Sequence, residues 1–275
     1  MAKLCTGTIS ASLADAYGEL TEAIPRQEQL GSDETSIKDN GKRHWIWCIT
    51  AATFSLFQIA ASRSRQVLEK LVGPEFAGYL NFDYFSANCS FAWNFWIKAQ
   101  YCWAHLIRDI RFLEKHPDKK TRVWAGQLLA RSRRLFSAWH RRDEMTAEGF
   151  HRSMLTHRDR FLAVVRKPPS TKEAANLAAR FAVVEYLDEE SSQTGRYDLS
   201  QDYFRFMFAE ELEPTNNHSE QQIRHCVIDR RHFYQETEPK APEAKRASAT
   251  TNGCGRPLQP AKSRTATSST SSSIQ

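Results

Sequence analysis

The sequence predicts an α/β fold, with a mixed sheet followed by a group of long helices and an unpatterned tail. Runs of aromatic and β-branched residues separated by turn signals fill residues 31–101, which is typical of short strands. Helical periodicity dominates residues 103–187. Residues 235–275 contain no aromatic residue and almost no large aliphatic one, so nothing there offsets the entropy lost on ordering. We therefore expect a disordered C-terminal tail.

The composition is that of an ordinary soluble globular protein, with 41% hydrophobic and 25% charged residues. No run approaches the roughly eighteen apolar residues of a membrane span, and the first residues lack the apolar stretch of a signal peptide. We expect a cytoplasmic protein with no membrane partner. Six cysteines are scattered without a C-x-x-C pair, which argues against a disulfide framework and favours reduced, buried thiols.

A helix and three strands open the chain. Residues 8–24 have the apolar spacing of a short amphipathic helix, which forms a lead-in over residues 1–30. The stretch that carries Asp33 then runs to Asn40-Gly41, a two-residue hairpin signal because both positions tolerate positive φ. The segments HWIWCITAA and SLFQIAA follow, so we expect three antiparallel strands in a meander.

A helix then carries the chain back to the sheet. RSRQVLEKLVG is helical and ends at Gly73-Pro74, and the apolar run GYLNF lies directly before Asp83. A strand that returns to a sheet after a helix is normally a right-handed parallel crossover. If this fourth strand lies beside the first, Asp33 and Asp83 come together. A fifth short strand, KAQYCW, leads into the amphipathic helix AHLIRDIRFLEKH.

The region after this helix is predicted to be helical. Helical patterns cover residues 119–166 and resume over EAANLAARFAVVEYL after a break at Pro168-Pro169. The segment SQDYFRFMF fits either a strand or a helix. Pro214 starts a last segment, TNNHSEQQIRHCVIDRR, which predicts a helix that carries Glu220.

Positive charge is concentrated in one segment. The chain has a net charge of +6, but residues 104–167 alone have an excess of nine positive charges, and residues 168–235 have an excess of five negative charges. Such a basic segment fits a surface that faces nucleic acid. A solvated helical face is the alternative interpretation.

Three acidic residues suit two-metal phosphoryl transfer. This chemistry needs carboxylates that hold two hard cations beside the attacking and leaving oxygens. Mg²⁺ suits such a site because it binds few protein oxygens and keeps water or phosphate as its other ligands. Asp33, Asp83 and Glu220 meet the requirement if the last helix packs beside the first and fourth strands. Spacing alone leaves ordinary roles open, as a polar strand end for Asp33 and a turn residue for Asp83.

Four segments resemble the conserved blocks of a known family. In chain order, DETSIKDNGKRHWIWC, DYFSAN, CWAHLIRDIRFL and EPTNNHSEQQIRHCVIDRR are similar to blocks of the insertion sequence 66 family transposases, which belong to the DDE class. The resemblance runs from about Leu4 to Arg231. It places the family's first Asp on Asp33, its second on Asp83 and its Glu on Glu220.

The resemblance implies an RNase H-like mixed sheet with a large all-helical insertion. The catalytic core would occupy residues 31–115 and 213–234, and the insertion would occupy residues 116–212. The implied activity is metal-dependent nicking at transposon ends followed by strand transfer from a 3′ hydroxyl, with two Mg²⁺ or Mn²⁺ ions held by the three acids. The implied partners are DNA at the transposon ends and target, further copies of the chain in a synaptic complex, and accessory transposon proteins.

Basic residues of the last helix are candidates for DNA binding. Arg224 lies one turn after Glu220, where it could meet a DNA phosphate or form a salt bridge with Glu220. Arg230 and Arg231 are further candidates for phosphate contacts.

Two other pairs of residues each have two interpretations. Asn216 and Asn217 are suited to cap the helix that bears Glu220, and a role in orienting Glu220 is the alternative. Cys102 and His105 form a C-x-x-H pair, which is a spacing found in zinc sites. No second pair accompanies it in the sequence, so burial on a helix face is the favoured interpretation.

The sequence departs from the family pattern at both ends. Family members begin with a zinc-ligand cysteine cluster and a helical DNA-binding region, whereas this chain starts just ahead of the catalytic region. After the IDRR segment, a Ser/Thr/Pro-rich tail stands where the family has an apolar helix, which indicates a shifted reading frame near residue 232. We therefore expect an impaired or inactive remnant. A non-catalytic DNA-binding product and a structure-selective nuclease are the alternatives.

Overall fold

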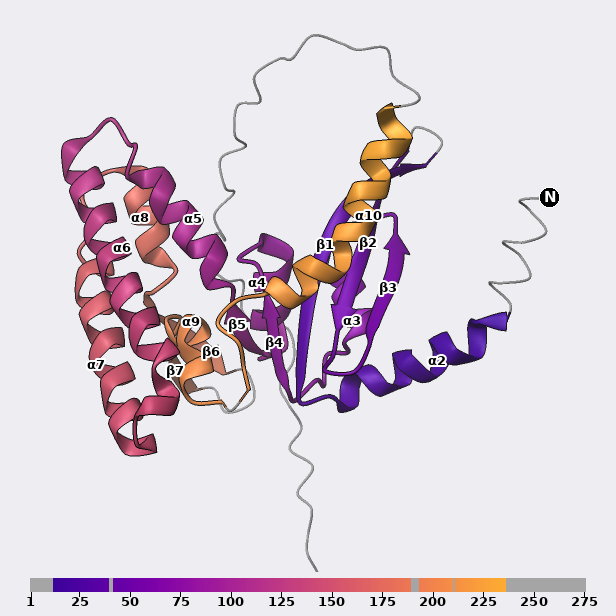
Figure 1. Ribbon diagram of the computed structural model, residues 1–275, viewed down its shortest axis with the longest axis horizontal. Coiled ribbons are helices and arrows are strands. Elements are labelled where there is room, and N and C mark those ends of the chain that lie inside the picture. The colour runs from indigo at the N-terminus through magenta and orange to yellow at the C-terminus, as the bar shows by residue number, and fades with distance from the viewer. Residues whose placement is uncertain (1–11, 40–41, 189–192, 210, 236–275) are drawn as a thin grey trace, which may run out of the picture.

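The computed structural model describes residues 12–39, 42–188, 193–209 and 211–235. These residues form a sheet-containing region and a helical region that lie side by side (Figure 1). The chain passes from the first region to the second through α5 (Trp103–Leu113) and returns to the sheet in α10 (Asn217–Gln235). The sheet region is thus built from two separated parts of the chain.

Five strands form one mixed sheet. Its order is β3-β2-β1-β4-β5, in which β1, β2 and β3 are an antiparallel meander and β4 and β5 join parallel to β1. The strands are β1 (Gln29–Asp39), β2 (Lys42–Thr50), β3 (Ser55–Ala60), β4 (Tyr79–Phe82) and β5 (Lys98–Tyr101).

The predicted order of the first four strands is confirmed, including the pairing of the first with the fourth. The Asn40-Gly41 turn lies outside the described residues, but Asp39 and Lys42 on either side of it are paired as the hairpin requires. The pairing puts β1 in the middle of the sheet, where it can contribute side chains to a site at the ends of β1 and β4.

The two faces of the sheet are covered by different helices. Trp47 and Ile49 of β2 are fully buried in the same core as Leu68 of α3 and Phe91 of α4. The alternate residue, Cys48, points to the other face, where α10 lies along β1 and β2 (Figure 1). The bounds of these helices are α3 (Arg65–Leu71) and α4 (Ser86–Asn94).

The lead-in is helical, as predicted. α2 (Ala14–Ala23) is followed by a 3-10 turn, η1 (Ile24–Arg26), and α2 reaches β3 through a hydrogen bond from the Tyr17 hydroxyl to Gln58 Oε1 (2.5 Å). The predicted start of this helix, residues 8–11, lies outside the described residues. Ile24 is fully buried, and it fastens the end of the lead-in to the core.

The helical region is held together by aromatic rings. Trp103 of α5 meets Phe136, Phe161 and Phe204, with ring centroids 5.2–5.4 Å apart in edge-to-face contact. The elements of this region are α6 (Lys119–His140), η2 (Arg142–Glu144), α7 (Ala147–Val165), α8 (Lys172–Ala179), α9 (Gln201–Phe204) and η3 (Arg205–Met207). The ambiguous SQDYFRFMF segment is therefore helical.

The prediction of an all-helical insertion over residues 116–212 is wrong in one place. β6 (Val183–Asp188) and β7 (Gln193–Asp198) form an antiparallel hairpin, where helix was predicted as far as residue 187. The apolar residues of VVEYL fit either period, so local sequence did not decide between them. Aromatic contacts favour the strand, because the ring centroid of Tyr186 lies 6.3 Å from that of Trp93 in α4 and 4.6 Å from that of Trp96, which follows α4. The predicted disordered tail was residues 235–275; Gln235 is the last residue of α10, and residues 236–275 lie outside the described residues.

Candidate active site

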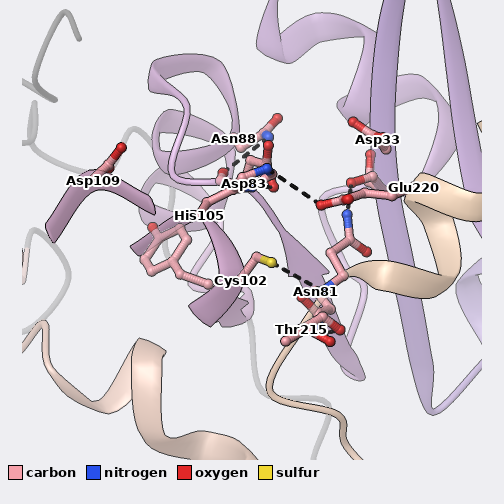
Figure 2. A network of polar contacts seen from close by, with 12 residues as sticks. Asp33, Asn81, Asp83, Asn88, Cys102, His105, Asp109, Thr215 and Glu220 are labelled. Carbon is pink, nitrogen blue, oxygen red and sulfur yellow. Dashed lines mark hydrogen bonds and ion pairs between the residues drawn. The ribbon is translucent and has the colours of Figure 1, made fainter. Parts of the chain in front are cut away.

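The register of β1 and β4 brings two of the predicted acids to the same end of the sheet. Gly31 of β1 pairs with Asn81 of β4, and the chains continue in parallel from there. Asp33 and Asp83 each stand two residues beyond that pair, so their side chains leave the sheet from neighbouring positions. Figure 2 shows them facing a common space, with Glu220 entering from α10.

A glycine lets α10 approach the sheet closely enough for Glu220 to join this group. A Cβ at Gly31 would overlap Ser219 Oγ and Thr50 Oγ1, so a larger residue requires these side chains or the helix itself to shift. Ser219 and Thr50 are themselves buried and share a hydrogen bond of 2.7 Å between their hydroxyls. Since Ser219 precedes Glu220, this contact fixes the height of Glu220 above the sheet.

The segment that leads into α10 is tied to the strands by two asparagines. Asn81 Nδ2 donates to the carbonyls of Glu213 (2.8 Å) and Thr215 (3.0 Å). Asn216 Nδ2 donates to the carbonyl of Ser32 (2.8 Å) on β1. Both asparagines are buried, so their amides replace backbone partners that the turn would otherwise lack.

The predicted capping role of Asn216 is only partly what the structure contains. Its carbonyl accepts the first helical hydrogen bond, from the Glu220 N–H (3.1 Å), which is the backbone role of a cap residue. Its side chain instead holds β1. Asn217 is the first residue of α10. The side chain of Asn216 therefore positions the helix relative to the sheet.

The acids repel one another in the absence of a cation. Burial raises the pKa of Asp33 to about 7, and the nearby carboxylates of Asp83, Glu34 and Glu220 raise it in the same direction. A hydrogen bond from the Glu34 N–H to Asp33 Oδ1 (2.8 Å) opposes this shift but does not cancel it. Asp33 thus lies in a place where added positive charge would be strongly favourable.

Glu34, although adjacent to Asp33, has a different partner. Its buried side chain accepts from Arg63 Nε (2.7 Å) and forms an ion pair with the same guanidinium. Arg63 also stacks over the ring of Phe85, 3.7 Å from its centroid, in the loop that follows Asp83. This chain of contacts links β1 to the loop after β4. Burial raises the pKa of Glu34 and the ion pair with Arg63 opposes that shift, so we assign Glu34 and Arg63 a structural role.

His105 joins the other two acids. Its Nδ1 contacts Asp83 Oδ1, and its Nε2 lies 3.4 Å from Glu220 Oε1 (Figure 2). Burial lowers the pKa of His105, but the contact with Asp83 and a hydrogen bond with Cys102 outweigh that effect and raise the pKa to about 10. The imidazole is therefore cationic at neutral pH, and it lies between two carboxylates as a positive charge.

Cys102 completes this group. Its Sγ accepts a hydrogen bond from the Asn216 N–H (3.2 Å) at the entrance to α10. One donor atom from each of Asp83, Cys102, His105 and Glu220 lies within 4.8 Å of the other three. The sequence contained the C-x-x-H spacing but not its partners, because Asp83 and Glu220 come from other elements.

The carboxylates fit a divalent cation. Asp83 Oδ1 and Glu220 Oε1 are both buried and lack a well-aligned hydrogen bond. In the described part of the chain, their ion-pair partner is His105. A carboxylate oxygen that is buried without an aligned donor is a ready ligand for a hard cation. Together with Asp33, these atoms provide an oxygen-rich site that a cation can enter.

The three predicted DNA-binding arginines lie on α10. Arg224 is exposed to solvent, while Glu220 has His105 as its ion-pair partner. The side chains of Arg230 and Arg231 lie outside the described residues. An exposed guanidinium one turn from the acid cluster remains available to an external phosphate.

Comparison with known proteins identifies the family of the chain. The model of the transposase IS66 family matches residues 1–244, which is most of the chain. The chain belongs to the IS66 transposase family. A search of curated proteins and a search of solved structures each gave no match.

Membership of the IS66 transposase family makes this chain a transposase by descent, and it implies an interaction with DNA. Among the described helices of this transposase, none is both long and apolar enough to cross a membrane. The acid cluster at the ends of β1 and β4 is therefore the first place to look for its chemistry.

Proposed function

We propose that this IS66 family transposase is a DDE-type enzyme with an RNase H-like core, in which Asp33, Asp83 and Glu220 are the catalytic acids. The carrying observation is that three carboxylates, from β1, from the residue after β4 and from α10, converge at one end of a sheet of order β3-β2-β1-β4-β5. Three acids on separate elements, which share one imidazole between Asp83 and Glu220, suit a site that works on phosphodiesters through bound cations.

The proposed reaction is nicking at transposon ends followed by joining of a DNA 3′ hydroxyl to target DNA. Two Mg²⁺ or Mn²⁺ ions held here would supply an activated oxygen nucleophile and neutralise the charge that develops on the phosphate. The three acids bind and orient the ions. Asp33 must lose its proton to do so, and Gly31 allows the helix approach that puts Glu220 in place.

We also propose the organisation of the chain that this function requires. Residues 31–115 and 213–234 form the catalytic core, residues 1–30 a helical lead-in, and residues 116–212 an insertion. The support is that α10, which packs against β1 and β2, follows the whole helical region in the sequence.

The test is metal-dependent nicking of supercoiled plasmid DNA by the purified chain. With Mg²⁺ or Mn²⁺ we expect conversion to the nicked form, and we expect Asp83→Asn to lower the rate on the order of 1,000-fold because a metal ligand is lost. Asp159→Asn is the matched control, since Asp159 is exposed on α7 and paired with Arg158. Nicking that is equal in wild type and Asp83→Asn, or that needs no divalent ion, would exclude the proposal.

A second function, metal-independent binding of DNA, is favoured by a separate observation. Burial lowers the pKa of His157 on α7, and four nearby arginines lower it in the same direction: Arg160, Arg134, Arg141 and Arg131. Such a gathering of positive charge on α6 and α7 fits a phosphate backbone. If this is the whole function, the chain will bind DNA in a salt-dependent manner with EDTA present and will not nick it with any metal.

A further inference from the structure

Cys102 lies in the acid cluster but has no part in the proposed reaction. Its backbone N–H donates to the Phe82 carbonyl (3.0 Å) at the end of β4, so the thiol is fixed beside Asp83. His105 follows one turn later on the same face of α5. Cys102 is 2% exposed, and the Asn216 N–H donates to its Sγ. An N–H bond to sulfur is the kind of outer contact that holds a thiolate ligand in place.

Four donors of three chemical kinds converge here. The donor atoms of Asp83, Cys102, His105 and Glu220 lie within 4.8 Å of one another. In a tetrahedral zinc site with bonds of about 2.0–2.3 Å, ligand atoms are roughly 3.3–3.8 Å apart. Side-chain rotations on the order of 1 Å would bring the more distant donor atoms to this spacing and move His105 Nδ1 and Asp83 Oδ1, which are in direct contact, apart to it. Asp83 Oδ1, His105 Nδ1 and Glu220 Oε1 are buried and lack well-aligned hydrogen bonds.

The donor types select the cation. Mg²⁺ takes oxygen ligands in near-octahedral geometry and has little affinity for a thiolate. A thiolate and an imidazole with two carboxylates are ligands that Zn²⁺ and Co²⁺ accept, in four-coordinate form. We propose that Asp83, Cys102, His105 and Glu220 bind one zinc-class cation, in a mode that excludes the Mg²⁺-dependent arrangement. This inference rests on the proposed function insofar as Asp83 and Glu220 serve both modes.

The zinc-class mode has a consequence for activity. It takes two of the three acids into a closed shell of four protein ligands and leaves Asp33 outside. Structural zinc sites of this kind keep no open position for a substrate oxygen. Low concentrations of Zn²⁺ should therefore inhibit nicking in the presence of excess Mg²⁺. The inhibition should be relieved when a chelator that prefers zinc is added.

The experiment is titration of the full chain with Co²⁺, which reports a thiolate ligand by a charge-transfer band in the near ultraviolet. We expect the band in wild type and its loss in Cys102→Ser, with Zn²⁺ affinity lowered on the order of 100-fold or more, beyond the 10–100-fold typical of outer contacts. Cys48→Ser is the matched control, because Cys48 is a buried thiol of the same sheet that is not in the donor set. Its band should persist.

A wild-type measurement makes the result independent of how the variants fold. Zinc-edge X-ray absorption should find one sulfur at about 2.3 Å and nitrogen or oxygen atoms at about 2.0–2.1 Å. A first shell without sulfur, or a Co²⁺ band that survives Cys102→Ser, overturns the inference. These outcomes need no DNA cleavage. If the chain nicks DNA with Mg²⁺ but lacks the sulfur ligand, the proposed function stands and this inference fails. If the sulfur ligand is found but Mg²⁺ supports no nicking, the zinc-class site stands and the proposed function fails.

Discussion

The helical region and the sheet region both bury carboxylates, but they treat the charge differently. In the helical region, Asp202 is 5% exposed and accepts from the Tyr197 hydroxyl (2.8 Å) and from Arg205 (3.0 Å). In the sheet region, Asp83 and Glu220 share His105, and Asp33 is surrounded by other acids. A compensated carboxylate holds a fold together, whereas an uncompensated group is available to a ligand.

The causes of the pKa shifts make the same distinction. Burial raises the pKa of Asp202 to about 6, while Arg205 and the hydrogen bond from Tyr197 oppose the shift. For Asp33, burial and the neighbouring carboxylates act in the same direction, and the pKa rises to about 7. Environment, not burial alone, separates the structural acid from the candidate catalytic one.

The largest expected effect on stability comes from breaking the compensated pair. Asp202→Ala leaves Arg205 with its charge unpaired in a largely buried position, so we expect the free energy of unfolding to fall by about 3–5 kcal/mol. Urea denaturation followed by circular dichroism measures it. A loss below about 1 kcal/mol would mean that Arg205 finds another partner and that the two regions differ less than proposed.

Two glycines sharpen the comparison next. Gly31→Ala should lower the free energy of unfolding by about 1–3 kcal/mol and also reduce the rate of nicking. The reason is that the new methyl group pushes Ser219, and with it Glu220, away from the sheet. Gly126→Ala in α6 is the control, since the nearest atom to its added Cβ is 3.9 Å away. That substitution should stabilise the helix by about 0.5–1 kcal/mol. Equal effects at the two sites would contradict the close approach of α10.

Removing an uncompensated charge should have the opposite sign. We expect Asp33→Asn to abolish nicking yet raise the free energy of unfolding in EDTA at pH 8 by about 1–3 kcal/mol, after allowance for solvent screening. The pKa of Asp33 is raised in the folded state, from 3.8 to about 7. The stability due to protonated Asp33 is therefore fully present below pH 4 and is lost as the pH rises to about 7.

The pH profile isolates this effect. Groups that do not interact with Asp33 titrate alike in wild type and Asp33→Asn, so the difference between the unfolding free energies of the two proteins reports Asp33 and the carboxylates beside it. This difference should be near zero at pH 4, grow through the interval to pH 7 and stay constant above it. Chemical denaturation at several pH values gives the curve. A difference that does not change with pH would show that Asp33 is not the titrating group.

The smallest expected effect concerns Arg224, the exposed arginine one turn from the acid cluster. Arg224→Ala should leave the free energy of unfolding unchanged because the side chain is exposed. It should weaken DNA binding and lower the slope of log affinity against log salt by about one, as expected for one phosphate contact. Arg65→Ala on α3, across the sheet, is the control and should keep the wild-type slope. An unchanged slope in Arg224→Ala would remove Arg224 from the DNA surface.

Sequence reasoning succeeded where the signal was local and strong. The stretch before Asn40-Gly41 and the apolar runs after it predicted the meander, and the helix between β3 and β4 predicted the parallel return that pairs β4 with β1. It failed at β6, where VVEYL suits a helix or a strand and the rings of Trp93 in α4 and Trp96 just after it favour the strand. It also undervalued His105, whose partners are far away in the sequence.

By itself, the sequence determined the family, the strand order around Asp33 and Asp83, and the helix that carries Glu220, because these depend on local pattern and on blocks of residues. Only the tertiary structure decided which acids are compensated. Arg63 opposes the effect of burial on the pKa of Glu34, whereas the carboxylates around Asp33 add to the effect of burial on its pKa. The physical reason is that electrostatic energy depends on distances in space, and those distances are set by how α10 packs on the sheet.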